Sequence, residues 1–384
     1  MQYAPMDPTA NKRLHSATGL IPSPLMMGVD GRMIERYQRL ITLYYIKSGA
    51  SAVIPGAHTG QFARNDLSLY KDWLQLVKEM TGRFDNDGRM FLMAAAGGNN
   101  EHAMKMAEAA KANGYHLLMV APTAFEKPDG EQLPEEGAIK LMQEIAGIIP
   151  VYGFYLQKAV GGRELSSGFW SELFDFSYGA KIAPFKVAET DKVMNAAVRH
   201  GRRDELVMST GNDDGIVRDL SSIWHHPENV ATYKKIQAGL LGHYATDTYS
   251  NIRLAEDVKW VRDGGSLTKE PFISHSMGGI GSVVSNMNFA LFDADDLPRK
   301  PPYQNSVFGV HYRLAKLLGL DAKMMAIRWV GPDGKTTRVE SGRAGLELEI
   351  DNQYQIGMEL GLTDEEFIRQ NLEQWKAMID FKHI

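Results

Sequence analysis

The 384-residue sequence contains no cysteine. This absence excludes disulfides, zinc–thiolate sites and cysteine nucleophiles, and it is typical of a protein of the reducing cytoplasm. The sequence also lacks any run of about 18 apolar residues, so we expect no membrane span. Its opening, MQYAPMDPTANKRLHS, has no apolar core of the kind that a signal peptide needs. We therefore expect a cytoplasmic protein.

Clusters of lysine and arginine are also missing, and the formal net charge is −5. A protein that binds nucleic acid is usually more basic, so we expect no nucleic-acid partner. The overall composition, with 44% hydrophobic and 23% charged residues, is typical of a soluble globular protein. The length allows one large α/β domain with extensions or two smaller domains.

Short apolar runs alternate with stretches of helical periodicity over the first two hundred residues. The helical stretches, such as 33–49 and 100–114, end in glycine, a common helix stop. The strand-like runs are 19–26, 51–57, 89–97, 116–122, 149–156, 181–187 and 205–211. This alternation predicts a parallel sheet covered by helices, and its spacing favours an α/β fold of the (β/α)8 TIM-barrel type. A doubly wound fold is less favoured because no phosphate-binding glycine fingerprint follows the first run.

The eighth strand is predicted at 278–289, GGIGSVVSNMNF, after a long insertion at about 216–277. The barrel then spans 1–290, and 291–384 form a mainly helical C-terminal extension. Within that extension, 326–340 read as a hairpin that turns on Pro-Asp-Gly.

Side chains at the C-terminal ends of barrel strands point into the active site. The second strand is followed by His58, Thr59 and Gly60, whose backbone amides suit a carboxylate. The fifth strand ends at Tyr155 and the sixth at Lys186. These three strand ends are the predicted site.

Lys181 and Lys186 are separated by an odd number of residues, so on a regular strand they face opposite sides. If Lys186 points inward, loss of solvation lowers its pKa, and the neutral amine can attack a carbonyl to form a Schiff base. Periodicity alone leaves a solvent-exposed lysine as the alternative. Pro184 interrupts this pattern, because proline is unusual in a central strand.

The ordered series of these segments resembles the dihydrodipicolinate synthase / N-acetylneuraminate lyase family of class I (Schiff-base) aldolases. AHTGQ is similar to the family's Gly-Thr-Thr-Gly-Glu motif, and FYLQKAVGGREL to the stretch that carries its catalytic tyrosine. IAPFKVAET is similar to its Gly-Ile-Lys segment, STGNDDG to its Gly-Asp-Asp segment and GIGSVVSNMN to its Gly-Val-Ile-Ser segment. The resemblance covers about residues 15–215 and 278–288.

The resemblance implies a lyase that cleaves or forms a carbon–carbon bond, or dehydrates a sugar-acid-like substrate, through a lysine Schiff base. Its substrate would be a 2-oxo acid of the pyruvate type, and no metal or cofactor would be needed. The implied catalytic residues are Lys186 and Tyr155, the latter in preference to Tyr152 as proton shuttle. The implied substrate-binding residues are Thr59, His58, Gly60 and Val283. A homo-oligomer, dimer or tetramer, is also implied.

Some positions depart from the family pattern. His58 stands where the family has its first threonine. The tyrosine that dihydrodipicolinate synthases take from the next subunit falls on Thr123 or Ala124, and their substrate-binding arginine falls on Val160. These departures argue against a true dihydrodipicolinate synthase.

Two other functions stay open on the sequence. One is a metal-dependent barrel aldolase or hydrolase that uses His58, Asp213 and histidines of the insertion, among them His225, His226 and His243. The other is a catalytically degenerate barrel that binds a small acid. Asp213 also belongs to Asn-Asp-Asp-Gly, which is typical of a turn.

Overall fold

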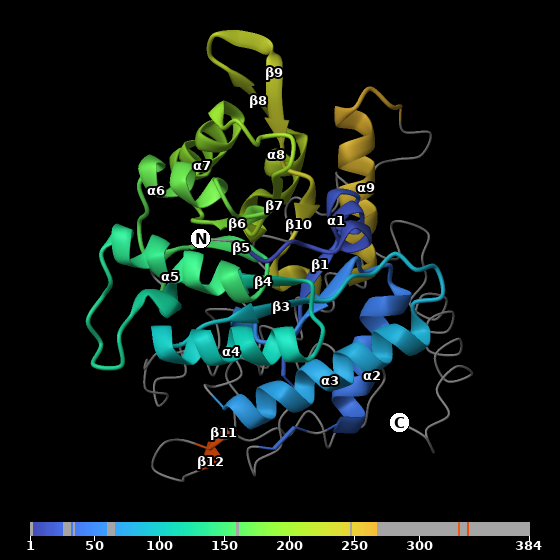
Figure 1. The fold of residues 1–384 in the computed structure, drawn as a ribbon. Helices are drawn as coiled ribbons and strands as arrows, with labels where there is room; N and C mark the ends of the chain where they lie inside the picture. Colours follow the sequence, from blue (N-terminus) through green and yellow to red (C-terminus); the bar gives the residue numbers. More distant parts are fainter. Residues whose placement is uncertain are drawn as a thin grey trace.

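The structure is a computed structural model, shown in Figure 1. It describes residues 3–25, 32–33, 35–59, 66–158, 161–245, 248–266, 329–330 and 336–337. Strands and helices alternate through most of this part, as the sequence predicts. The parallel strands are β1 (Leu20–Pro22), β2 (Ala52–Ile54), β3 (Met93–Ala96), β4 (Leu117–Val120), β5 (Val151–Leu156), β6 (Gly179–Ala183), β7 (Val207–Thr210) and β10 (Ala238–Gly239). The helices are α1 (Pro8–His15), α2 (Glu35–Lys47), α3 (Leu67–Phe84), α4 (Asn100–Ala112), α5 (Glu135–Ile148), α6 (Ser167–Phe174), α7 (Val187–Arg199), α8 (Ile216–Ser221) and α9 (Thr248–Arg262).

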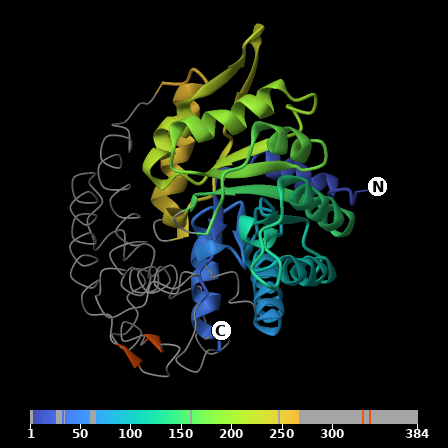
Figure 2. The same cartoon turned by 90° about the vertical axis from the view of Figure 1, so that its left-hand side faces the viewer.

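The strands form a curled parallel sheet with helices on its outside (Figures 1 and 2). One sheet has the order β10-β7-β6-β5-β4-β3, and β1 pairs with β2 separately. Backbone hydrogen bonds join this pair to both edges of the larger sheet. Phe91 donates to Ser51 O (3.1 Å) on the β3 side, and Gly239 donates to Thr18 O (2.9 Å) on the β10 side. The predicted α/β fold with a parallel sheet is therefore confirmed.

The strand that follows β7 in the sheet differs from the prediction. It is β10, whose Ala238 and Gly239 are in register with Ser209 and Thr210 of β7. This strand lies inside the range predicted as an insertion, and its two residues are too few to give a strand pattern in the sequence. The antiparallel hairpin of β8 (Ile223–His226) and β9 (Asn229–Lys235), which projects from the body in Figure 1, lies between β7 and β10.

The predicted strand at 278–289 lies outside the described residues, as does most of 291–384. Within the latter range, β11 (Trp329–Val330) pairs antiparallel with β12 (Thr336–Thr337), where the sequence predicts a hairpin. The helices of the described part include none that is both long and apolar enough to cross a membrane.

Helix caps follow the local sequence. Asn99, the N-cap of α4, accepts a hydrogen bond from the backbone N–H of His102 (2.9 Å). Asp66 caps α3 in the same way through Leu69 (3.0 Å). Such a cap contributes about 1 kcal/mol of stability. The two caps fix where each helix leaves its preceding loop.

Side chains alternate between two apolar faces along each strand, as the period of a strand requires. On β5, Val151 and Tyr155 pack in the layer between sheet and helices, whereas Tyr152 and Phe154 belong to the inner cluster. The inner cluster consists of Leu20, Ala52, Ile54, Ala57, Phe91, Met93, Ala95, Leu117, Met119, Ala121, Tyr152, Phe154, Leu156, Ala183, Val207, Ala238 and Leu240, with Met6, Ala10, Leu14 and Ala17 of the N-terminal segment. The curled sheet thus encloses a packed interior.

Candidate active site

Lys181 lies on the inner face of β6. It is in register with Phe154 of β5 and with Ser209 of β7, so both neighbours flank it at the same level of the sheet. Its Nζ is 4.2 Å from the centroid of the Phe154 ring, and only 6% of the residue is exposed. A lysine is rarely buried to this degree in a protein. The structure therefore brings a sequestered amine into the interior of the sheet.

Burial lowers the pKa of Lys181 to about 8, although the negative charge of Asp213 partly opposes the shift. Loss of solvation disfavours the ammonium form, and a nearby carboxylate favours it. With a pKa of about 8, about one molecule in ten carries a neutral Lys181 amine at pH 7, against roughly one in three thousand for an ordinary lysine. The interior thus makes Lys181 far more nucleophilic than a surface lysine.

Gly211, directly after β7, leaves the space that the Lys181 side chain occupies. A Cβ at this position would lie 2.5 Å from Lys181 Cε and 2.7 Å from the Cβ of Ala183. Real Cβ atoms do not approach other carbons so closely, and a packed interior does not yield easily. Glycine at 211 is therefore a steric requirement for the inward lysine.

Lys186 does not lie where the sequence predicts it. Its side chain is exposed, and the residue is the N-cap of α7. The parity argument is wrong here because β6 already ends at Ala183. Phe185 then adopts a left-handed conformation with φ 56°, which turns the chain before Lys186. Lys181, rather than Lys186, is the lysine that faces the interior.

Tyr155 is also placed differently from the prediction. It packs in the sheet–helix layer, with its ring centroid 5.5 Å from that of Trp170, and its hydroxyl donates a short hydrogen bond to Glu189. Burial raises its pKa, and Glu189 raises it further. The inward tyrosine of β5 is Tyr152, whose hydroxyl donates to Ser209 Oγ (2.9 Å).

His58 and Thr59 follow β2 at the C-terminal end of the sheet. The hydroxyl of Thr59 donates to the backbone carbonyl of Pro22 (2.5 Å), which ties the loop to β1. Burial lowers the pKa of His58 to about 3, and the positive charge of Lys181 lowers it as well. The other two residues predicted to bind substrate, Gly60 and Val283, lie outside the described residues.

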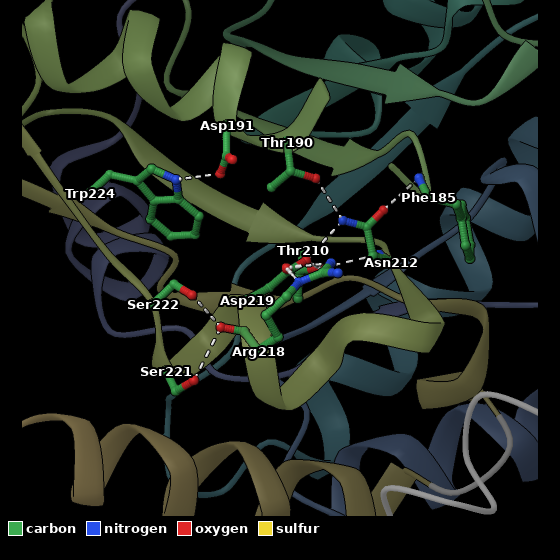
Figure 3. A network of polar contacts seen from close by, with 10 residues as sticks. All are labelled: Phe185, Thr190, Asp191, Thr210, Asn212, Arg218, Asp219, Ser221, Ser222 and Trp224. Carbon is green, nitrogen blue, oxygen red and sulfur yellow. Dashed lines mark hydrogen bonds and ion pairs between the residues drawn. The ribbon is translucent and has the colours of Figure 1, made fainter. Parts of the chain in front are cut away.

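A buried polar network holds the turns that follow β6 and β7 (Figure 3). The Asn212 side-chain carbonyl accepts from the Phe185 N–H (2.8 Å), and its amide donates to Thr190 Oγ1 (3.0 Å) and Asp219 Oδ2 (2.8 Å). Arg218 pairs with the other oxygen of Asp219 (2.8 Å). The network holds Phe185 in its left-handed conformation, with its ring packed against the inner cluster.

Two histidines of the predicted insertion lie away from this site. His225 and His226 belong to the projecting hairpin, where the His225 ring contacts the carbonyl of Val230 (2.7 Å). Within the described residues, no three His, Asp or Glu side chains are grouped as metal ligands would be. This part of the chain therefore offers no site of the kind that the metal-dependent alternative requires.

No family model and no curated protein matches the sequence. Solved structures do match. A monomeric dihydrodipicolinate synthase variant superposes with a TM-score of 0.64 at 15% identity, covering 91% of this chain and 99% of its own. A sialic acid aldolase from Ruminococcus gnavus gives 0.63 at 13% identity, covering 88% and 98%.

A prophage protein of the dihydrodipicolinic acid synthase family from E. coli, in complex with pyruvate, gives a TM-score of 0.62 at 16% identity and covers 90% and 99%. This chain shares its fold with these proteins. The resemblance found in the sequence is thus confirmed as a resemblance of fold, at low sequence identity.

The local sequence also distinguishes Lys181, the lysine that faces the interior, from Lys186. Gly179-Ala180-Lys181 has glycine two residues before lysine, as the family's Gly-Ile-Lys segment does, whereas Lys186 has Pro184 at that position. Gly211 gave no comparable signal, since its importance depends on a contact with Lys181 across two strands.

Proposed function

We propose that this chain is a lyase that acts on a 2-oxo acid of the pyruvate type through a Schiff base, and that Lys181 forms it. The observation that carries the proposal is the buried Lys181 amine, with a pKa lowered to about 8, on the inner face of β6. Lys186, the lysine that the sequence favours for this role, has an exposed side chain, so water solvates its ammonium group.

The chemistry follows from the neutral amine. Lys181 Nζ attacks the C2 carbonyl of the acid, and loss of water gives an iminium ion. The iminium draws electrons from the adjacent C3, so the C3–C4 bond can break and leave an enamine on the lysine. Because the iminium itself accepts the electron pair, this reaction requires no metal or other cofactor.

Two observations support a pyruvate-type substrate. The fold is shared with a protein solved in complex with pyruvate and with N-acetylneuraminate lyases. The loop after β2 also carries His58 and Thr59 beyond the C-terminal end of that strand, and backbone amides of such a loop suit a carboxylate. Gly60 and Val283 remain proposed substrate contacts on the sequence resemblance alone.

The substrate is proposed to differ from that of dihydrodipicolinate synthases. Thr123 or Ala124 stands where those enzymes use a tyrosine from the neighbouring subunit, and Val160 where they use an arginine. The proposed reaction is therefore an aldol cleavage or a dehydration of a sugar-acid-like substrate. A complete (β/α)8 barrel, a cytoplasmic location and a homo-oligomer of two or four chains remain predictions that accompany this proposal.

Reductive trapping tests the proposal. The protein is incubated with pyruvate and borohydride, and the modified peptide is mapped by mass spectrometry. We expect an adduct on Lys181. Turnover that is lost to a chelator, with no adduct, would favour the metal-dependent alternative. A melting temperature raised by pyruvate, with neither adduct nor turnover, would favour a small-acid-binding barrel.

A further inference from the structure

The N-terminal segment packs across one end of the interior that holds Lys181. Helix α1 and the residues beside it belong to the inner cluster. The N–H of Met6 donates to the hydroxyl of Tyr178, directly before β6 (2.9 Å), and Arg13 donates to the carbonyl of Met90, shortly before β3 (2.6 Å). This segment therefore covers the N-terminal ends of the strands, and a substrate has to approach Lys181 from their C-terminal ends.

The Lys181 side chain runs toward the C-terminal ends of the strands. Its backbone is in register with Ser209 of β7. A Cβ on Gly211, two residues further along the chain, would nevertheless lie 2.5 Å from Lys181 Cε. The end of the lysine side chain is thus carried past the level of its own backbone. Because only 6% of Lys181 is exposed, the residues beyond it shield the amine from solvent.

Phe185 lies beyond the lysine at this end. Its N–H donates to Oδ1 of Asn212, the residue after Gly211 (2.8 Å; Figure 3), so its backbone lies past the level of Lys181 Cε. Among the described residues, two partly exposed apolar side chains pack against the inner cluster, Tyr178 and Phe185. Tyr178 precedes β6 and lies at the N-terminal end. Phe185 is therefore the one at the lysine's end that borders both the interior and the solvent.

The inner-cluster side chains at the same end are covered more completely. Leu156 ends β5, Ala183 ends β6 and Leu240 follows β10, and each is at most 3% exposed. They line the interior without reaching solvent. The partly exposed ring of Phe185 thus lies where a solute passes from the solvent to the amine.

The backbone of Phe185 is strained. Within the described part of the chain it is the one residue other than glycine with a positive φ, 56°. A left-handed conformation is unfavourable for a residue that carries a side chain, and such strain is concentrated at functional sites, where the surroundings maintain it. Here Asn212 maintains it by accepting from the Phe185 N–H. The strain lowers the cost of a second arrangement, in which the backbone relaxes and the ring leaves the inner cluster.

We propose that Phe185 determines which 2-oxo acids reach Lys181, because its ring limits the width of the group that passes from the solvent to the amine. The inference rests on the proposed Schiff-base function. Pyruvate, whose C3 is a methyl group, passes the ring with the smallest displacement. An acid with an unbranched chain passes end-on, with the chain left pointing outward. An acid that is branched at C3 displaces the ring furthest and reacts most slowly.

The rates at which two 2-oxo acids are trapped measure this selectivity. Pyruvate and the branched acid 3-methyl-2-oxobutanoate are each incubated with protein and borohydride, and mass spectrometry follows the adduct on Lys181. Phe185→Gly removes the ring and adopts a positive φ without strain, so the turn is kept. We expect this variant to raise the rate for the branched acid, relative to the rate for pyruvate, by about tenfold or more. Phe185→Asn, a second residue that tolerates this conformation, should act in the same direction.

Two control variants separate the ring from a general effect on packing. Phe185→Tyr keeps a ring at this position and should retain the parent ratio of the two rates. Phe84→Ala removes a partly exposed ring that packs against the layer between sheet and helices, and it should also retain that ratio. A melting temperature for each variant confirms that it is folded.

Acylation of Lys181 separates this inference from the proposed function, because it requires no Schiff base. Acetic anhydride and the bulkier benzoic anhydride are compared, and the labelled peptides are mapped. A benzoyl label on Lys181 that rises in Phe185→Gly more than the acetyl label supports control of access by the ring. If the parent protein traps no pyruvate but shows this change, the Schiff-base function fails and control of access stands. Parent ratios for both pairs of reagents in a folded Phe185→Gly would overturn the role of Phe185 and leave the Schiff base standing.

Discussion

Lys181 and Phe154 face each other across neighbouring strands, with the lysine Nζ 4.2 Å from the centroid of the phenylalanine ring. The ring shields the amine from water on one side and supplies a π-face that attracts the ammonium form. It has no hydroxyl to exchange protons. The pair thus explains how the site desolvates its nucleophile.

The reactivity of Lys181 should follow a low pKa. We expect the rate at which a small acylating reagent labels Lys181 to rise with pH and to level off above about pH 8, because only the neutral amine reacts. In Asp213→Asn the midpoint should move to lower pH, since the charge that raises the pKa of Lys181 is removed. Labelling of Lys181 that still rises steeply near pH 10 would contradict this account.

Gly211→Ala should disturb the lysine directly. The new methyl group would lie 2.5 Å from Lys181 Cε, so we expect a loss of about 1–3 kcal/mol of unfolding free energy and weaker trapping of pyruvate. Gly147→Ala is the matched control, because a Cβ at that exposed position of α5 meets nothing within 4 Å. Urea unfolding and trapping yield measure both variants. Equal behaviour of the two would show that Gly211 makes no room for Lys181.

Tyr155→Phe tests whether this residue acts as the predicted proton shuttle or only packs in the sheet–helix layer, where the structure has it. Its hydroxyl contacts Glu189 in the helix layer, so we expect normal trapping of pyruvate by borohydride. We also expect normal hydrogen–deuterium exchange at the methyl group of pyruvate in D₂O, which NMR follows. The loss of one hydrogen bond to a charged group should cost about 1.5–3 kcal/mol of stability. A variant that folds normally but loses exchange would restore Tyr155 as the shuttle.

Asn212→Ala should loosen the turns behind the site. The amide side chain makes three hydrogen bonds, to Phe185, Thr190 and Asp219, the last two fully buried, and its removal takes a partner from each of these groups. We expect a loss of about 3 kcal/mol in urea unfolding. Ser221→Ala, which removes an exposed hydroxyl at the edge of the same network, should change stability by less than about 0.5 kcal/mol. Similar losses in both variants would mean that the network does not hold the turns.

Much of the fold was predictable because strand and helix periods are local properties. The strand-like runs that became β1 to β7 carry apolar residues at nearly every position, as a strand covered on both faces requires. The strand β10 was not predictable in this way. β10 has two residues, one of them glycine, and only its hydrogen bonds with β7 and Thr18 define it.

The site was predictable by segment but not by residue. The sequence predicts an inward-facing lysine in the β6 segment, and the structure has one there, Lys181. The parity rule, however, holds only while a strand continues, and β6 ends three residues before Lys186. Phe185, with its φ of 56°, breaks the alternation of side chains between the two faces. A left-handed backbone conformation is uncommon for phenylalanine, so the sequence does not predict it. Tyr152 and Tyr155 are separated by an odd number of residues within one strand, so the same rule places them on opposite faces of β5, as the structure does.

The identity of the trapped lysine tests the central claim most directly. The parent protein, Lys181→Ala and Lys186→Ala are each incubated with pyruvate and borohydride, and intact masses and modified peptides are measured. We predict a single adduct on Lys181 in the parent and in Lys186→Ala, and none in a folded Lys181→Ala. Adduct formation that survives in Lys181→Ala and disappears in Lys186→Ala would contradict the account.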